Sequence, residues 1–308
     1  MSNEQKIIVI VGPTASGKSD CAVRLAKYIE KNKKKFDTCG AEIISADSRQ
    51  VYRGMDIGTG KITKKEMQRV PHHLLDVVSP KKTYTVADYQ KDARRVLEKI
   101  FKKNKIAIVC GGTGFYIDAF VRGLVIPEVP PNNALRKKLS KKNADSLFAI
   151  LEKKDPVRAK TIDRKNPVRL VRAIEITTAL GAVPIPQNSP LTAKTLFIGV
   201  SPKKEILHKK ISMRLKKRIR AGMIYEVIKL KKSGISWKKL DMFGLEYRYL
   251  SRYLAGKIKK REALETLEKE INAYAKRQMT WFKRNNDIHW IKNRTEIRML
   301  LEKFLFGK

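Results

Sequence analysis

Gly12-Pro13-Thr14-Ala15-Ser16-Gly17-Lys18-Ser19 is the stretch of sequence that decides the fold. An apolar run over residues 7–11 precedes it, and residues 21–26, whose apolar positions recur at helical spacing, follow it. This order predicts a strand, a phosphate-binding loop and a helix. The spacing G-x-x-x-x-G-K-S lets backbone N–H groups converge on an anion at a helix N-terminus, while Lys18 reaches the outer phosphate oxygens and Ser19 offers a hydroxyl to Mg²⁺. We therefore predict that this loop binds a diphosphate or a triphosphate.

The composition fits a globular protein with a strong excess of positive charge. The 308 residues suffice for one large or two modest domains, and 42% of them are apolar. Lysine and arginine total 68 against 30 acidic residues, a formal net charge of +38. Such an excess favours a polyanionic partner such as nucleic acid, although a generally basic proteome would leave the same excess.

Targeting signals are absent from the sequence. No run approaches the roughly 18 apolar residues of a membrane span, and no signal peptide precedes the first strand. We therefore expect a cytoplasmic protein that does not engage a membrane. Cys21, Cys39 and Cys110 are isolated from one another, and we interpret them as small core residues in a reducing compartment.

A second predicted strand, residues 41–46, ends in Asp47-Ser48-Arg49-Gln50. In an open parallel sheet, ligands bind at the carboxyl ends of the strands. The Asp47 carboxylate at that edge has two functional interpretations, a ligand of Mg²⁺ or ordered water and a general base. It could also cap the turn that follows, which would be a structural role alone.

A third predicted strand, residues 106–110, ends in Gly111-Gly112-Thr113-Gly114. The glycines permit close approach of the backbone to a ligand. Thr113 presents a hydroxyl toward the same crevice, but it could equally be the N-cap of the helix that follows, and both roles can hold together.

Helix signals and further strands complete the core. Thr85-Val86-Ala87-Asp88 is a capping box that opens a long helix ending near Lys103. Apolar runs predict strands at residues 195–200 and 288–291, and long helices are expected at residues 203–221 and 260–285.

The character of the chain changes between residues 124 and 190. Short basic helices follow one another there without strand-like runs, and Asp155-Pro156 and Asn166-Pro167 each place proline at the first position of a helix. We predict an α/β fold with a P-loop NTPase-like parallel sheet core, formed by residues 1–123 and 191–308, and a helical insertion domain over residues 124–190.

One longer block carries a family resemblance. After the loop GPTASGKS comes the block Asp47-Ser48-Arg49-Gln50-Val51-Tyr52-Arg53-Gly54-Met55-Asp56-Ile57-Gly58-Thr59-Gly60-Lys61. Together, the loop and this block resemble the tRNA dimethylallyltransferases, also called tRNA isopentenyltransferases. Segments 71–76, 111–116 and 275–282 fit the same pattern, so the resemblance runs from residue 7 to about residue 292. It implies transfer of a dimethylallyl group from dimethylallyl diphosphate to N6 of the adenosine 3′ of the anticodon in tRNA.

The resemblance also implies roles for single residues. Asp47 would take the proton of the adenosine amine, Thr113 would orient that amine or the adjacent phosphate, and Arg214 would reach back to the diphosphate. Ser19 would hold Mg²⁺. The insertion domain would clasp the anticodon stem-loop. The residues that match the tRNA-contacting positions of the family are Asp47, Ser48, Arg49, Gln50, Thr113, Arg136, Val168, Arg169, Leu170, Val171, Arg172, Lys276, Arg277 and Gln278.

Some of these positions depart from the family pattern or could have a structural role instead of contacting RNA. Val168 departs from the glutamine that is usual in the family. Arg169 and Arg172 share a helical face that suits phosphates but could equally be a solvated basic face. Trp281 and Phe282 could stack on RNA bases, but for these aromatics alone we favour the core.

Two rival functions remain open from the sequence. The phosphate loop alone would favour an ATP-binding kinase of a small molecule, and a nucleotide-gated RNA-binding protein without transfer chemistry would carry the same charge. Labelled dimethylallyl diphosphate and γ-labelled ATP would discriminate between them. We expect a monomer, because nothing in the sequence demands a dimer.

Overall fold

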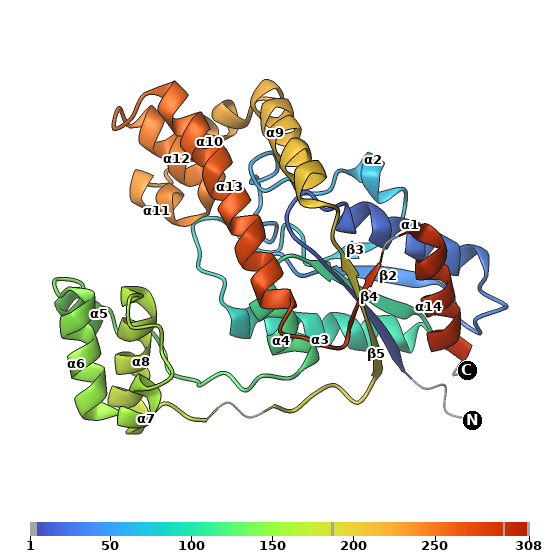
Figure 1. Cartoon of the computed structure of the whole chain (residues 1–308), viewed down its shortest axis with the longest axis horizontal. Coiled ribbons are helices and arrows are strands. Elements are labelled where there is room, and N and C mark those ends of the chain that lie inside the picture. The colour runs from blue at the N-terminus through green and yellow to red at the C-terminus, as the bar shows by residue number, and fades with distance from the viewer. Residues whose placement is uncertain (1–4, 186–187, 292, 307–308) are drawn as a thin grey trace. The chain divides into compact units, whose positions relative to one another are not determined.

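A computed structural model of the chain describes residues 5–185, 188–291 and 293–306. The chain divides into two compact units, Met1–Arg122 with Pro190–Lys308, and Gly123–Ser189 (Figure 1). The larger unit contains the sheet and the phosphate loop, and the smaller unit is helical.

A six-stranded sheet forms the centre of the larger unit, with every pairing parallel and the order β3-β2-β4-β1-β5-β6. The α/β fold with a parallel sheet is therefore confirmed. The central strands β1, β2 and β4 are mostly apolar runs buried on both faces, as is usual in parallel sheets. Only the two-residue β3 was not expected from the sequence. The strands are β1 (Lys6–Val11), β2 (Ala41–Ser45), β3 (His72–His73), β4 (Ile106–Gly111), β5 (Lys194–Val200) and β6 (Ile288–Ile291).

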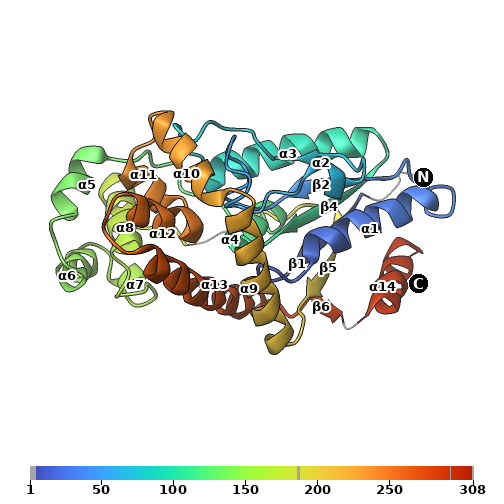
Figure 2. The ribbon, with the colours of Figure 1, turned by 90° about the horizontal axis from the view of Figure 1, so that it is seen from above.

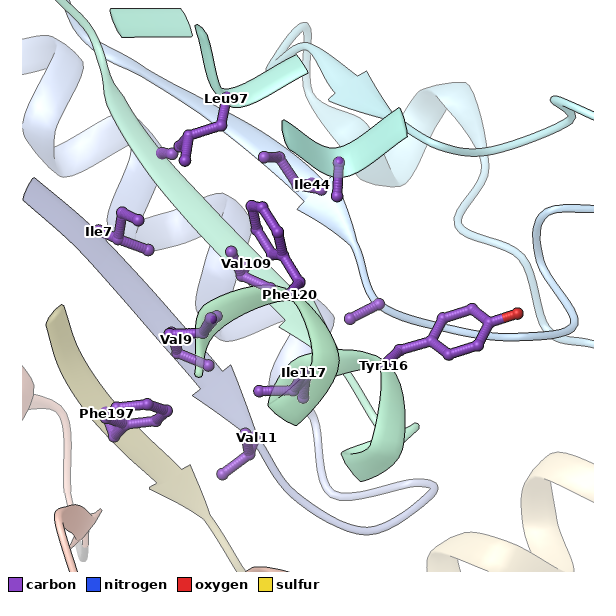
Figure 3. Close-up of a cluster of buried hydrophobic side chains, with 14 of the residues drawn as sticks. Ile7, Val9, Val11, Ile44, Leu97, Val109, Tyr116, Ile117, Phe120 and Phe197 are labelled. Atoms are coloured by element: carbon purple, nitrogen blue, oxygen red, sulfur yellow. The ribbon is translucent and has the colours of Figure 1, made fainter. Parts of the chain in front are cut away.

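Helices cover both faces of this sheet. The helices α3 (Val86–Lys102) and α4 (Gly114–Val121) pack on one face, and α1 (Lys18–Lys31) and α14 (Arg294–Phe306) pack on the other. Side chains alternate along β1, so residues 7, 9 and 11 join the first cluster while residues 8 and 10 join the second. Figure 3 shows Val9 and Val11 of β1 near Ile117 of α4, and Val109 of β4 near Phe120.

The start of α3 confirms the predicted capping box. The Thr85 hydroxyl accepts the backbone N–H of Asp88 at 3.2 Å, and the Asp88 carboxylate accepts the backbone N–H of Thr85 at 2.8 Å. The cysteine interpretation is only partly right. Cys110 is buried, Cys21 is half-buried and Cys39 is exposed. Cys39 is exposed because it lies in the turn before β2 rather than in a strand.

A group of helices lies at the carboxyl edge of the sheet and encloses a third apolar cluster. The helix α9 crosses α13 in this group (Figure 2). Phe282, at the end of α13, is buried in the core, as favoured from the sequence, and the Trp281 indole N–H donates to Asp118 at 2.9 Å. The helices of this group are α9 (Lys204–Arg220), α10 (Met223–Lys232), α11 (Trp237–Met242), α12 (Leu245–Leu254) and α13 (Lys260–Phe282). The short α2 (Lys64–Met67) contacts α1 instead.

The smaller unit packs its helices around a leucine-rich cluster that includes Leu147, Leu151 and Leu170. Both predicted proline starts are confirmed, because α7 begins at Pro156 and α8 at Pro167. The side chains of the preceding aspartate and asparagine accept backbone N–H groups of the first turns. The helices are α5 (Asn133–Leu139), α6 (Ala144–Lys154), α7 (Pro156–Ala159) and α8 (Pro167–Leu180).

Among the helices in the described ranges, none combines the length and the apolar character that crossing a bilayer requires.

Candidate active site

The phosphate loop connects β1 to α1 and depends on two of its glycines. Gly12 lies so close to the end of β5 that a Cβ there would come within 2.3 Å of the Val200 carbonyl oxygen. Gly17, with φ of 95°, takes the left-handed conformation that starts α1. The loop therefore opens into a helix N-terminus, where the first backbone N–H groups are free to meet an anion.

Two cations close over this loop. The Lys18 ammonium donates to the Pro13 carbonyl at 3.3 Å, and the Arg214 guanidinium, from α9, donates to the Thr14 hydroxyl. Both line a cavity of about 680 Å³ together with Ser19. The structure thus brings Arg214 to the phosphate loop, 200 residues away in sequence.

Loss of hydration lowers the pKa values of both cations. Burial lowers the pKa of Lys18, and the like charge of Arg214 contributes in the same direction. Burial, followed by the charge of Arg218, lowers the pKa of Arg214 to about 10. Poorly hydrated cations that repel one another favour a multiply charged anion between them.

Gln278 of α13 holds the loop against the strand ends. Its Oε1 accepts the Thr14 backbone N–H at 2.7 Å, and its Nε2 donates to the Gly112 carbonyl at 2.8 Å. The side chain is 6% exposed. Gln278 was expected to contact tRNA, and the structure instead places its amide between two loops of the larger unit.

Asp47 follows β2 and lies at the same edge of the sheet. Its Oδ1 accepts the backbone N–H groups of Arg49 at 2.8 Å and Gln50 at 3.3 Å, so the turn-capping role is present. Among the described residues, the hydrogen bonds to this carboxylate end on Oδ1, which leaves Oδ2 able to accept another donor. The charge of Asp47 acts on Lys18, Arg214 and Tyr274, so the carboxylate lies near the cations of the loop.

Thr113, after β4, bonds to the neighbouring loop and does not cap α4 with its side chain. Its Oγ1 accepts the Ser48 backbone N–H at 3.1 Å and lies 3.4 Å from the Ser48 hydroxyl. Thr113 is the N-cap residue of α4, as the alternative predicted, but it caps through its carbonyl and not through its hydroxyl. The threonine joins the segment after β4 to the segment after β2.

The exposed side of α13 carries the remaining candidate RNA contacts of the larger unit. Lys276 and Arg277 are exposed, and the Arg277 guanidinium lies 6.0 Å from the centre of the Tyr274 ring. Partial desolvation, followed by the nearby charge of Asp47, raises the pKa of Tyr274 to about 12. A basic surface with an aromatic ring therefore lies near Asp47.

In the smaller unit, two of the candidate RNA-contacting arginines bind one buried carboxylate. Arg136 makes two bonds to Glu175, at 2.9 and 2.8 Å, and Arg172 makes one at 2.6 Å. Burial opposes the charge of Glu175, but the bonds from both arginines outweigh it and hold the pKa of Glu175 at about 2. Both arginine side chains remain about a third or more exposed, at 42% and 34%.

The neighbouring positions on α8 differ in exposure. Val168 and Arg169 are exposed at the first turn, Val171 is half-buried, and Leu170 is fully buried in the core of the unit. The Leu170 side chain has no access to RNA in this structure. The two arginines on this helical face therefore differ. Arg172 forms an ion pair with Glu175, whereas Arg169 is exposed and makes no bond to Glu175.

Two residues of the site, one lining the cavity and one bonded to it, were missed in the sequence. Arg218 lies four residues after Arg214, which is a spacing that could have signalled it. Glu246 bonds to Arg218 at 3.1 Å, and nothing in the local sequence marks it.

A metal ion at this site would depend on few protein ligands. The described part of the chain contains no group of three or more His, Cys, Asp or Glu side chains that could hold one. The Ser19 side chain is exposed to the cavity. One hydroxyl, completed by phosphate oxygens and water, fits the way Mg²⁺ usually binds.

The parallel sheet with a phosphate loop after β1 and an acid after β2 defines a P-loop-like α/β enzyme. The sequence pattern of the family described as IPP transferase matches residues 50–285. The chain is 41% identical over 299 residues to tRNA dimethylallyltransferase 1 of Azobacteroides pseudotrichonymphae, covering 94% of this chain and 93% of that protein. It is 41% identical over 301 residues to tRNA dimethylallyltransferase 2 of Treponema denticola, covering 94% and 97%.

A solved structure agrees with these sequence relatives. The tRNA isopentenylpyrophosphate transferase from Bacillus halodurans matches with a TM-score of 0.70 and 32% identity, over 99% of this chain and 96% of that one. The chain belongs to the tRNA dimethylallyltransferase family.

Proposed function

We propose that this protein transfers a dimethylallyl group from dimethylallyl diphosphate to N6 of the adenosine 3′ of the anticodon in tRNA, giving N6-dimethylallyladenosine and diphosphate. One observation carries the proposal for this chain. Two half-buried cations, Lys18 and Arg214, contact the phosphate loop, and a strand-end carboxylate lies near them. Family membership supplies the identity of the two substrates.

The loop and its cations are suited to a departing diphosphate. When the bond from the allylic carbon to oxygen breaks, negative charge develops on the diphosphate, and Lys18 and Arg214 stabilise it. Two amides of the loop are engaged within the protein, Thr14 with Gln278 and Ser16 with the Pro13 carbonyl. We therefore expect the diphosphate to bind the amides of residues 15 and 17–19.

Mg²⁺ is the cation that we propose for the diphosphate, with Ser19 as its protein ligand. When bound, it would neutralise part of the charge on the diphosphate. The Ser19 side chain, exposed to the cavity beside Lys18 and Arg214, supports this role.

Asp47 is suited to receive the proton from the adenosine amine. N6 is a poor nucleophile because its lone pair is delocalised into the purine, so a base that accepts its proton during attack accelerates the reaction. The turn bonds to Oδ1 fix the carboxylate and leave Oδ2 to accept the N–H. Thr113 holds the Ser48 backbone beside it and thereby fixes the edge on which the amine would lie.

The basic surfaces would hold the tRNA. In the larger unit we propose contacts from the Ser48 to Gln50 segment and from the exposed Lys276 and Arg277. We propose that residues 124–190 bind the anticodon stem-loop through the exposed Arg169 and through the free N–H groups of Arg136 and Arg172. The net charge of +38 supports binding to a polyanion, and RNA loops release a base at modest cost.

A tRNA substrate would place the protein in the cytoplasm. We propose that it acts as a monomer.

Mass spectrometry tests this function. Purified protein, dimethylallyl diphosphate and unmodified tRNA should yield the dimethylallyl mass on the adenosine beside the anticodon. A parallel reaction with γ-labelled ATP should leave every acceptor unlabelled. Label transferred from ATP, or tRNA that is bound but never modified, would contradict the proposal.

A further inference from the structure

Arg218 lies beside the phosphate loop without a role in the reaction as described above. It projects from the same face of α9 as Arg214, one turn further along. It lines the same cavity of about 680 Å³ as Lys18, Ser19 and Arg214. Its side chain is only 12% exposed. A cation buried to this extent needs partners that compensate for its lost hydration.

Three contacts fix the Arg218 guanidinium at the cavity wall. Its Nη1 donates to Glu246 Oε1 at 3.1 Å and to the Gly58 carbonyl at 3.3 Å. Its Nη2 lies against Gly60, where a Cβ would come within 1.5 Å of that nitrogen. Glu246, in the first turn of α12, supplies the one charged contact among the three.

A buried carboxylate fixes the backbone segment against which Arg218 packs. The buried Glu226 accepts the backbone N–H groups of Asp56, Ile57 and Gly58 at 2.8, 2.7 and 2.9 Å. The Tyr247 hydroxyl donates to the same carboxylate at 2.7 Å. The adjacent residues Glu246 and Tyr247 thus hold the arginine and the loop beneath it, so the guanidinium has a rigid support.

Electrostatics join Arg218 to the other cations of the site. The pKa of Lys18 and that of Arg214 are lowered first by burial, and the charge of Arg218 lowers both further. Burial raises the pKa of Glu246, and Arg218 is the main group that opposes this rise. Lys18, Arg214 and Arg218 therefore form one cluster, in which Glu246 offsets only part of the positive charge.

We propose that Arg218 is a second arginine that binds the diphosphate of the prenyl donor, and that Glu246 is the residue that positions it. This rests on the proposed function, because it assigns a substrate contact within the same site. The bond between the allylic carbon and the diphosphate oxygen breaks, the electron pair stays on that oxygen, and Lys18, Arg214 and Arg218 share the charge. An arginine suits this task because its N–H groups can bind two oxygens at once.

Direct binding of inorganic diphosphate tests the arginine. Isothermal titration calorimetry should give a Kd that rises about tenfold or more in Arg218→Met, with Arg218→Lys between this variant and the wild type. Arg220→Met is the matched control, because Arg220 is an exposed cation on the same helix outside the cavity lining. Its Kd should stay within about twofold of the wild type, as should tRNA binding by all three variants.

The positioning role of Glu246 is tested by the Kd for inorganic diphosphate in paired variants, because a general loss of stability would not produce the pattern expected there. Glu246→Ala should raise the diphosphate Kd about threefold or more, and Glu246→Gln, which keeps an acceptor oxygen, should restore it. In the Arg218→Met background, Glu246→Ala should have no further effect on the Kd, because the group that it positions is gone. An equal effect of Glu246→Ala in both backgrounds would remove the positioning role.

The outcomes separate the two claims. If wild-type protein transfers the prenyl group and Arg218→Met binds diphosphate as well as wild type, the Arg218 assignment is overturned and the proposed function stands. If tRNA binding falls with diphosphate binding in Arg218→Met, the assignment is overturned as well. If wild-type protein neither binds diphosphate nor modifies tRNA, the proposed function itself fails.

Discussion

Replacing Gln278 by methionine tests what holds the phosphate loop in place. Methionine has a similar length, but it cannot replace the bonds to the Thr14 N–H and the Gly112 carbonyl, at 2.7 and 2.8 Å. Gly112 is buried and Thr14 is half-buried, so water can compensate for one lost partner but not for both. We expect a loss of about 2–3 kcal/mol in the free energy of unfolding, and a thermal midpoint lower by roughly 5–10 °C.

The functional effect of Gln278→Met should be confined to the diphosphate. A loosened loop should raise the Kd for inorganic diphosphate about tenfold in calorimetry, while filter binding of tRNA stays within about twofold. Lys276→Met is the contrasting variant, because Lys276 is exposed on the same helix and should affect only tRNA. If Gln278→Met weakened tRNA binding and left diphosphate binding intact, the reasoning from these two bonds would be refuted and the sequence-based assignment to tRNA would hold.

Three further predictions concern single groups. Glu175 has a folded pKa of about 2, below its ordinary value of 4.5, so the stability that it contributes is present above pH 4.5 and is lost as the pH falls toward 2. Urea unfolding should give wild-type protein about 2 kcal/mol more acid destabilisation between pH 7 and pH 3 than Glu175→Gln, and equal acid sensitivity would exclude the Glu175 network as the cause. Thr113→Val removes the acceptor of the Ser48 N–H and should lower kcat about tenfold in steady-state assays, whereas Thr113→Ser should stay near wild type; similar kcat values for both variants would count against this role. Lys18→Met should weaken diphosphate binding by about tenfold or more and leave tRNA binding unchanged, and calorimetric affinity within about twofold of wild type would remove Lys18 from the site.

Local patterns were sufficient to predict much of the fold. The apolar runs that became β1, β2, β4, β5 and β6 each carry their own signal, because a strand buried on both faces needs continuous apolar residues. The capping box before α3 and the prolines that start α7 and α8 are equally local. The two-residue β3 has no such signal, since its pairing with β2 depends on the neighbouring strand rather than on its own sequence.

The contacts that organise the site were harder to predict from the sequence, because they join residues that are far apart in the chain. Gln278 meets Thr14 across 264 positions, and no local pattern predicts which way its amide points. Glu246 meets Arg218 across 28 positions and lies in a segment whose pattern gives no sign of this ion pair. The phosphate loop itself was predictable, because its spacing and its flanking strand and helix are all contiguous.

The central claim is that one carboxylate beside the phosphate loop takes the proton as the prenyl group moves. Single-turnover transfer by Asp47→Asn, with saturating dimethylallyl diphosphate and tRNA, measures this most directly, because asparagine can still accept the turn bonds through its side-chain oxygen. The account predicts a rate lower by about 10²–10⁴-fold, with the affinities for diphosphate and tRNA each within about twofold of wild type. A rate within about tenfold of wild type, or a loss of tRNA binding as large as the loss of rate, would contradict it.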